Sequence, residues 1–370
     1  MTDRQTDRQT DRQTDRQTGI VFNKRQTNIA KGIAVLLLLW HHVFFNRQDY
    51  YELFQSVYIF HGVPIECIFS DFCKVCVAIF VVLSGYGLYK SWDSKLIGFQ
   101  KEKNRSFRFT EQFAFVKAHL LKLLFGYWFI YLIFVPMGIF FDKPFWEIYN
   151  YNTIYGFIDF LGLANLFSTP SMNETWWFMG TIIVLYILFP SLMKLFSYSK
   201  ELTIAFAALL MILPIPNIGE LKTWLLPFVA GIYLADRRGF ERLDIQLNTL
   251  PKKYGVLVSG IIVTAVFVFY HGNSKLALLF AVTIIAISFS IVSRIPIICR
   301  VLEIFGKHSS GIFMFHTFIY KYYFQNFIYS FKISLIIFIV LSGICLAIAF
   351  LLEKVKHLIR LDGLLIKISR

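Results

Sequence analysis

The chain has 370 residues, of which 56% are hydrophobic and 16% are charged, with a mean hydropathy of +0.59. Soluble domains carry about 25% charged residues, so this composition excludes an ordinary soluble domain and indicates lipid as the solvent. The net charge of +14 does not indicate a nucleic-acid-binding protein, because the basic residues lie in short segments between apolar runs and form no basic face.

The N-terminus is a repeat. Residues 2–18 contain the tetrapeptide Thr-Asp-Arg-Gln four times and end on Thr18. This polar, charge-balanced sequence has no core to bury, so we expect residues 1–27 to form a disordered cytoplasmic tail. The tetranucleotide ACAG, read through successive frames, encodes Thr-Asp-Arg-Gln. We therefore hypothesise that the gene opens on a tetranucleotide tract, in which gain or loss of one unit shifts the frame and makes expression phase-variable. The alternative is a low-complexity tail without function.

Ten apolar runs follow, and a membrane-spanning helix needs about 20 residues. The sequence therefore predicts an all-α, polytopic membrane bundle of about ten transmembrane helices over residues 28–353, with a basic cytoplasmic tail at 354–370. The apolar stretch 57–69 contains ionisable residues and a proline, and it is predicted to be a re-entrant or interfacial piece. The ten runs cover about 28–46, 72–90, 121–141, 176–196, 202–216, 221–235, 254–271, 275–293, 305–324 and 333–353.

Lys and Arg are distributed unevenly between the segments that join these runs. If the N-terminus is cytoplasmic, the inner segments hold 30 of the 37 Lys and Arg residues and the outer segments hold seven. The positive-inside rule therefore predicts a multi-pass protein of the bacterial cytoplasmic (inner) membrane with both termini inside. The outer segment 142–175 is instead acidic, with Asp142, Glu147, Asp159 and Glu174.

The first predicted span carries two ionisable residues, Lys31 and His42, and such residues are costly in lipid and indicate function. They are eleven positions apart, which is about three helical turns, so they share one face and lie roughly 16 Å apart along the axis. A buried histidine can act as a general base near neutral pH. His41, about 100° round the helix, should matter less. The alternative is a snorkelling lysine and an interfacial histidine pair.

Cys73 and Cys76 form a lone Cys-x-x-Cys motif at the mouth of the second apolar run. A zinc site needs a second pair of ligands, which we do not find, so no metal site is predicted. We interpret these cysteines as small apolar helix residues.

Five motifs occur in order between residues 31 and 316. They are Lys31-Gly-Ile-Ala followed by His42, Ile79-Phe-Val-Val-Leu-Ser84-Gly85-Tyr86, Trp177-Phe-Met followed by Tyr186 and Pro190, Pro227-Phe-Val-Ala-Gly231-Ile-Tyr-Leu, and Phe305-Gly306-Lys-His-Ser309-Ser-Gly-Ile-Phe-Met-Phe-His316. In order and spacing they resemble the acyltransferase-3 family, the multi-span O-acyltransferases of bacterial surface glycans. The chain ends soon after the tenth run, which is similar to the stand-alone form without an extra esterase-like domain.

The resemblance implies an O-acyltransferase that moves an acyl group, most simply acetyl, from cytosolic acetyl-CoA or another acyl-CoA to a hydroxyl of an extracytoplasmic glycan. The acceptor would be lipopolysaccharide, capsule or a lipid-linked sugar, and no bound cofactor is implied. His42 would be the base, and Lys31 stands where the family usually has Arg. The residues that would lie along the substrate path are Ser84, Gly85, Trp177 and His316.

The chain also departs from the family pattern. The family often has Arg-x-x-Arg before the third span, where this chain has His119 and Lys122, and Ile182 replaces a glutamate found in some members. A lysine lacks the bidentate fork of arginine. His119 and Lys122 remain the candidates for binding the anionic donor, because cationic side chains suit the phosphates of CoA. Attraction of the basic loop to the lipid surface is the alternative.

Two other functions fit the composition. A transporter or flippase of lipid-linked sugars would be expected to show internal repeats or matching broken helices, and we find none beyond the break at Pro214 and Pro216. A polymerase or glycosyltransferase that uses a lipid-phosphate sugar would need an acidic metal site in the first outer loop. Asp49 and Glu52 lie there, but a cation site needs more oxygen ligands.

Sequencing of the gene tests the hypothesis about the repeat. We expect uninterrupted ACAG units through the codons of residues 2–18 and different unit numbers among clonal lineages. Mixed synonymous codons across the repeat would rule out a slipping tract.

Overall fold

The computed structural model describes residues 21–45, 47–103, 109–214, 216, 220–249, 252–269, 276–359 and 361. The N-terminal repeat and most of the 354–370 tail lie outside these residues. Each of the ten predicted apolar runs coincides with a helix. The ten helices are α2 (Lys24–Val43), α4 (Val75–Lys103), α5 (Phe109–Met137), α8 (Trp177–Tyr198), α9 (Lys200–Ile212), α10 (Leu221–Asp236), α12 (Lys252–Phe269), α13 (Ala277–Ser290), α14 (Pro296–Thr317) and α16 (Ser334–Leu358).

Among the described residues, five helical segments are long and apolar enough to cross a membrane, which supports an all-α membrane protein. The first, Ile65–Gly98, begins seven residues before the predicted second run, because α3 (Ile65–Cys73) joins α4 with only Lys74 between them. α2 is not among the five, since Lys31 and the histidine pair lower its hydropathy. The number of about ten spans, and the side on which the termini lie, stay predictions.

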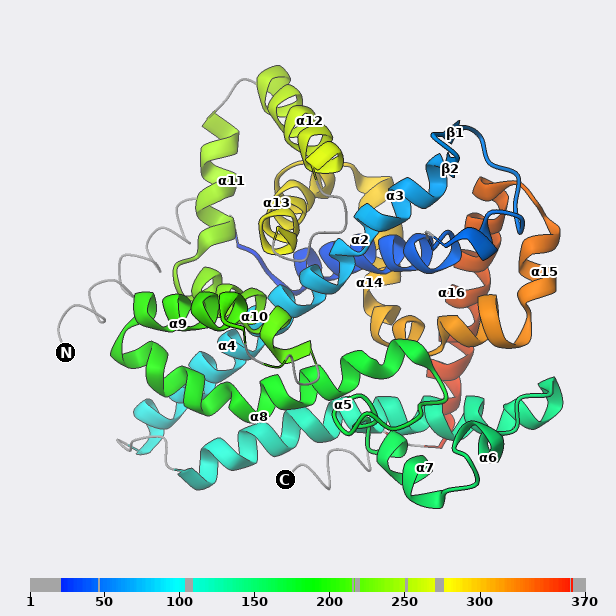
Figure 1. Ribbon diagram of the computed structural model, residues 1–370. Helices are drawn as coiled ribbons and strands as arrows, with labels where there is room; N and C mark the ends of the chain where they lie inside the picture. Colours follow the sequence, from blue (N-terminus) through cyan, green and yellow to red (C-terminus); the bar gives the residue numbers. More distant parts are fainter. Residues whose placement is uncertain are drawn as a thin grey trace.

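Short elements join the long helices, and those in the predicted outer segments gather at one end of the bundle (Figure 1). Gln55 pairs with Ile333 across a β-bridge, and Tyr329 donates to the Val43 carbonyl at 2.7 Å. The short elements are β1 (Ile59–Phe60), β2 (Val63–Pro64), α6 (Phe145–Ile148), α7 (Thr153–Phe160), α11 (Gly239–Thr249), α15 (Gln325–Ser330), the 3₁₀ turns η1 (Gln48–Tyr50), η2 (Gly138–Phe141), η3 (Glu174–Trp176) and η5 (Val292–Arg294), and the π-helix η6 (Phe318–Tyr323).

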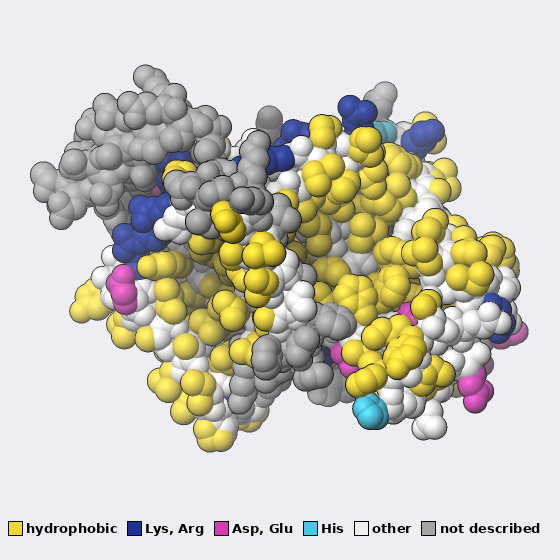
Figure 2. Space-filling view, turned by 90° about the horizontal axis from the view of Figure 1, so that it is seen from above, with side chains coloured by type: hydrophobic (Ala, Val, Ile, Leu, Met, Phe, Trp, Pro, Cys, Tyr) yellow, Lys and Arg dark blue, Asp and Glu magenta, His cyan; other side chains and the backbone are white. Residues whose placement is uncertain are grey.

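The stretch predicted to be re-entrant or interfacial forms the β1–β2 hairpin and α3. Buried Glu66 holds its base: one carboxylate oxygen accepts from the Val57 amide at 2.9 Å and the Ser334 hydroxyl at 2.9 Å, and the other accepts from the Ser56 hydroxyl at 2.7 Å. The carboxylate therefore joins the nearby 56–57 segment to the first residue of α16, which is 268 positions away in the sequence. Around the bundle, hydrophobic side chains cover much of the visible face, and charged side chains gather toward its edges (Figure 2).

Glycines allow two pairs of helices to approach with their backbones in contact. A Cβ atom at Gly32 on α2 would collide with the Leu302 carbonyl on α14, and one at Gly306 on α14 would collide with the Asn28 carbonyl on α2. α2 begins at an N-cap, where the Asn23 side chain accepts from two backbone amides of the first turn. Small residues at such crossings permit the close packing that holds helices together in a membrane. These contacts therefore determine which face of α2 packs against α14.

α4 and α10 meet in the same way. A Cβ at Gly85 would collide with the Phe228 carbonyl, and one at Gly231 would collide with the Val82 carbonyl. Gly85 is therefore a packing residue, and its place in a tight helix contact follows from its lack of a side chain.

The outer segment 142–175 is ordered around a buried carboxylate, Asp159, which is 1% exposed. It accepts hydrogen bonds from the hydroxyls of Tyr149 (2.8 Å) and Ser171 (2.8 Å) and from the Met172 amide (2.9 Å). The Tyr127 hydroxyl of α5 donates to the Asp159 carbonyl at 2.6 Å. This network fastens α7 and the 169–172 loop to α5.

Gly306→Ala tests the α2–α14 crossing. The added methyl group has no room against the backbone of α2, so we expect a loss of at least about 2 kcal/mol in the free energy of unfolding, as for an overpacked core. Thermal unfolding of the purified protein in detergent measures it. Gly343→Ala on α16 is the matched control, because a Cβ there meets nothing within 4 Å. Equal melting temperatures for the two variants would contradict the crossing.

Asp159 should make the outer segment sensitive to pH. Burial outweighs its hydrogen bonds and raises the pKa of Asp159 from the ordinary 3.8 to about 6. The folded state therefore holds the proton more tightly than the unfolded state, so stability falls as the pH rises from about 4 to about 6 and is level above that. Hydrogen exchange of residues 145–172 across this range measures it. Asp159→Asn should be less stable but should lose this pH dependence, and an unchanged dependence would contradict the assignment.

Candidate active site

The α2–α14 crossing brings His42 and His316 together. Their ring centroids lie 5.0 Å apart, and the ring of Tyr320 in η6 stacks beside both, at 6.3 Å from His42 and 5.9 Å from His316. His316 is fully buried and Tyr320 is 1% exposed, whereas His42 keeps a partly accessible surface. His42 is thus the least buried of the three residues.

Hydrogen bonds fix the tautomer of His316. Its Nδ1 lies 3.1 Å from the Ile312 carbonyl and 2.9 Å from the Phe313 carbonyl, and since carbonyls only accept, Nδ1 carries the proton. Nε2 of the neutral ring is then an acceptor, 3.5 Å from the Thr317 hydroxyl. No described residue hydrogen-bonds to the His42 ring. Its nitrogens can therefore bond to a substrate.

His41 has a different environment from His42. It is 6% exposed, and its Nδ1 donates to the Ser70 carbonyl of α3 at 2.7 Å. The bond ties the outer end of α2 to α3, so His41 supports the packing of this region. Removing the whole side chain would leave a buried carbonyl without its donor. A control at this position therefore needs a side chain that can still donate.

The turn η3 fastens α14 next to His316. The Trp176 indole donates to the Met314 carbonyl at 2.8 Å, and the Asn173 side-chain amide donates to the same carbonyl at 3.3 Å. Just beyond His316, α14 widens into the π-helix η6, a form that often occurs at functional sites. The neighbouring Trp177, which the sequence suggested for the substrate path, stacks on Trp224 with ring centroids 6.2 Å apart, and its role stays a prediction. The sequence holds no signal that Trp176, rather than the adjacent Trp177, is the buried tryptophan.

The remaining predicted path residues lie between α4, α8 and α14. Ser84 is half-buried and interacts with the Tyr186 hydroxyl of α8. One turn toward the outer end, Phe80 contacts Phe313 at 6.3 Å, and Phe313 lies 6.4 Å from His316. An aromatic stretch of the core therefore separates Ser84 from the histidine pair.

Cationic side chains gather at the other end of α2. The ammonium group of Lys31 lies within electrostatic range of Lys122 and Lys24, and His119 lies within range of Lys122 and Lys95. His119 also bonds through Nδ1 to the Phe115 carbonyl at 2.8 Å. The structure thus brings the predicted donor-binding residues Lys122 and His119 to the same end as Lys31. Such a cluster suits a polyanion.

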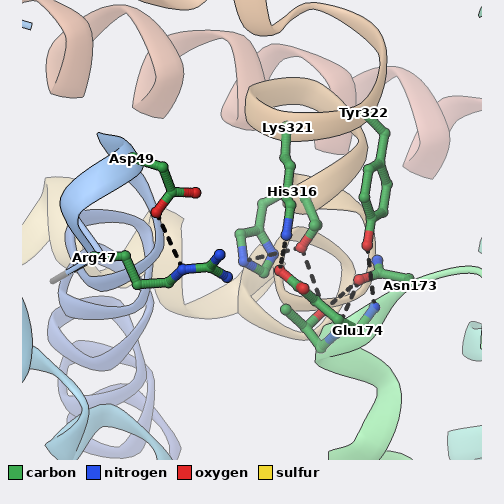
Figure 3. A network of polar contacts seen from close by, with 9 residues as sticks. Arg47, Asp49, Asn173, Glu174, His316, Lys321 and Tyr322 are labelled. Carbon is green, nitrogen blue, oxygen red and sulfur yellow. Dashed lines mark hydrogen bonds and ion pairs between the residues drawn. The ribbon is translucent and has the colours of Figure 1, made fainter. Parts of the chain in front are cut away.

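A polar rim lies beside the histidine pair, at the end of the bundle predicted to face outward (Figure 3). Lys321 of η6 bonds to Glu174 at 2.7 Å, and the Glu174 amide donates to the Tyr322 hydroxyl at 3.3 Å. Arg47 pairs with Asp49 at 3.2 Å beside them. Within the part of the chain that the structure describes, no cluster of three His, Cys, Asp or Glu residues could hold a metal ion.

The bundle of long apolar helices, with a histidine pair between two of them, defines a membrane protein with a candidate catalytic centre inside the bundle. The sequence model of a family described as an acyltransferase domain matches residues 26–354. The chain therefore belongs to the acyltransferase-3 family and is a membrane acyltransferase. No curated protein and no solved structure matches the chain.

Proposed function

We propose that this membrane acyltransferase moves an acetyl group from cytosolic acetyl-CoA to a hydroxyl of an extracytoplasmic surface glycan, such as lipopolysaccharide or capsule, in the bacterial inner membrane. His42 is the general base. The observation that carries the proposal is the place of His42, which is partly exposed as a residue, lies with its ring 5.0 Å from that of His316 and has no hydrogen bond to a described residue. An imidazole left free in this way can take a proton from a hydroxyl.

The proposed chemistry balances with these groups. The acceptor hydroxyl gives its proton to His42, its oxygen forms a C–O bond with the acyl carbon, and the C–S bond of the thioester breaks. The proton then passes to the departing CoA thiolate. The ring of His316 lies 5.0 Å from that of His42, and its neutral form avoids placing a second charge beside the protonated base.

The cationic cluster at the other end of α2 supports the choice of donor. Lys31, Lys122 and His119 would hold the phosphates of CoA, and the acyl group would travel along the apolar core toward His42. Because roughly 16 Å of helix separates Lys31 from His42, the donor must extend through the bundle or pass its acyl group to an intermediate.

His42→Gln tests the base. Glutamine keeps much of the side-chain volume but cannot accept the proton, so we expect the acetyl content of the surface glycan to fall by roughly 100-fold or more. Mass spectrometry of glycan from cells that carry each variant measures it. His41→Gln is the control, because its amide can still donate to the Ser70 carbonyl, and most acetylation should remain. Normal acetylation with well-expressed His42→Gln protein would remove His42 from the mechanism.

A further inference from the structure

The ion pair between Glu174 and Lys321 lies where a molecule from outside would approach the histidine pair. Lys321 directly follows Tyr320 in η6, so the ion pair lies one residue from the ring that stacks beside the candidate base. Tyr320 links the two regions: its ring stacks beside His42 and His316, and its hydroxyl lies within electrostatic range of Glu174 and Tyr50. Tyr320 therefore lies between the rim and the histidine pair.

Glu174 is held by its backbone and keeps a free side-chain oxygen. Its amide bonds to the Tyr322 hydroxyl, and the preceding residue, Asn173, bonds to the Met314 carbonyl. The carboxylate meets Lys321 through Oε1, and the side chain is 52% exposed, so the carboxylate is open to the solvent at the rim. A carboxylate placed in this way is preorganised to accept hydrogen bonds from an arriving molecule.

The rim suits a polyhydroxylated molecule better than a charged one. Two ion pairs lie at the rim, Lys321 with Glu174 and Arg47 with Asp49, so these four charges balance one another, and the ammonium group of Lys143 lies over the Tyr322 ring at 5.3 Å. Tyrosine rings combine an apolar face with a polar tip, which matches the alternating faces of a sugar. A carboxylate is a strong acceptor for hydroxyl donors.

We propose that Glu174 is the binding determinant for the acceptor, accepting hydrogen bonds from sugar hydroxyls at the rim while Lys321 orients its carboxylate. This inference rests on the proposed glycan acylation and names the residue that positions the acceptor for it. The competing explanation is a strut: the ion pair would only tie η3 to η6 and would contact no substrate.

Steady-state kinetics distinguish these explanations. The full-length protein in phospholipid nanodiscs is given radiolabelled acetyl-CoA and surface polysaccharide isolated from cells that lack the gene. For Glu174→Gln we expect the KM for polysaccharide to rise about tenfold, because a charged hydrogen bond is lost, while the KM for acetyl-CoA changes by less than about twofold. Glu147→Gln, an exposed acidic residue on α6, is the matched control and should keep both values.

A second substitution, Lys321→Gln, distinguishes a role of Glu174 in acceptor binding from a purely structural role. In the acceptor explanation, Glu174→Gln still raises the KM for polysaccharide in a Lys321→Gln background. In the strut explanation, each single substitution breaks the same ion pair. The KM for polysaccharide of the double variant should then equal that of either single variant. Loss of the effect in that background, or equal changes in both KM values, would overturn the proposal. No transfer by the unsubstituted protein would overturn the glycan acylation itself, and this inference with it.

Discussion

The contact between the backbones of α2 and α14 positions nearly every group of the candidate site. Gly32 and Gly306 remove the side chains that would keep these helices apart, so the outer turns of both meet with little freedom to rotate. His42 and His316 are carried at those turns, and their rings come within 5.0 Å. In a membrane, where lipid competes with apolar side chains for contact, van der Waals packing of this kind is a main source of helix association. The helix crossing that supports stability therefore also sets how the two helices carry the histidine pair, about ten residues farther along each of them.

The segments predicted to lie outside also help to hold the helices around the candidate site in place. η3 contributes two donors to a single carbonyl of α14, and the Asp159 network holds the neighbouring segment to α5. Glu66 does the same for the base of the hairpin and the start of α16. Buried polar groups of this kind are satisfied by partners far away in sequence, so they convert loops into fixed walls around the histidine pair.

The sequence predicts the helices well, because each is a local apolar run, and it predicts the register of Lys31 and His42, because both lie on one helix. It cannot predict that the ring of His316 lies 5.0 Å from that of His42, on the same scale as the 4.9 Å to His41, since that depends on how two distant helices cross. Asp159 and Glu174 read alike as acidic residues of an outer segment, yet one is a buried anchor and the other is half-exposed at the rim. Burial and pairing are tertiary properties, and a single sequence does not carry them.

The π-helix η6 gives this site an unusual way to change during evolution. A widened turn of this kind corresponds to one extra residue within an α-helix, and each residue turns a helix by about 100°. His316 precedes the widened turn, and Lys321 lies inside it. A single-residue insertion or deletion in η6 would therefore re-aim the rim while leaving the histidine pair at the crossing in place. Acceptor preference could diverge between related chains through length changes alone, with the chemistry conserved.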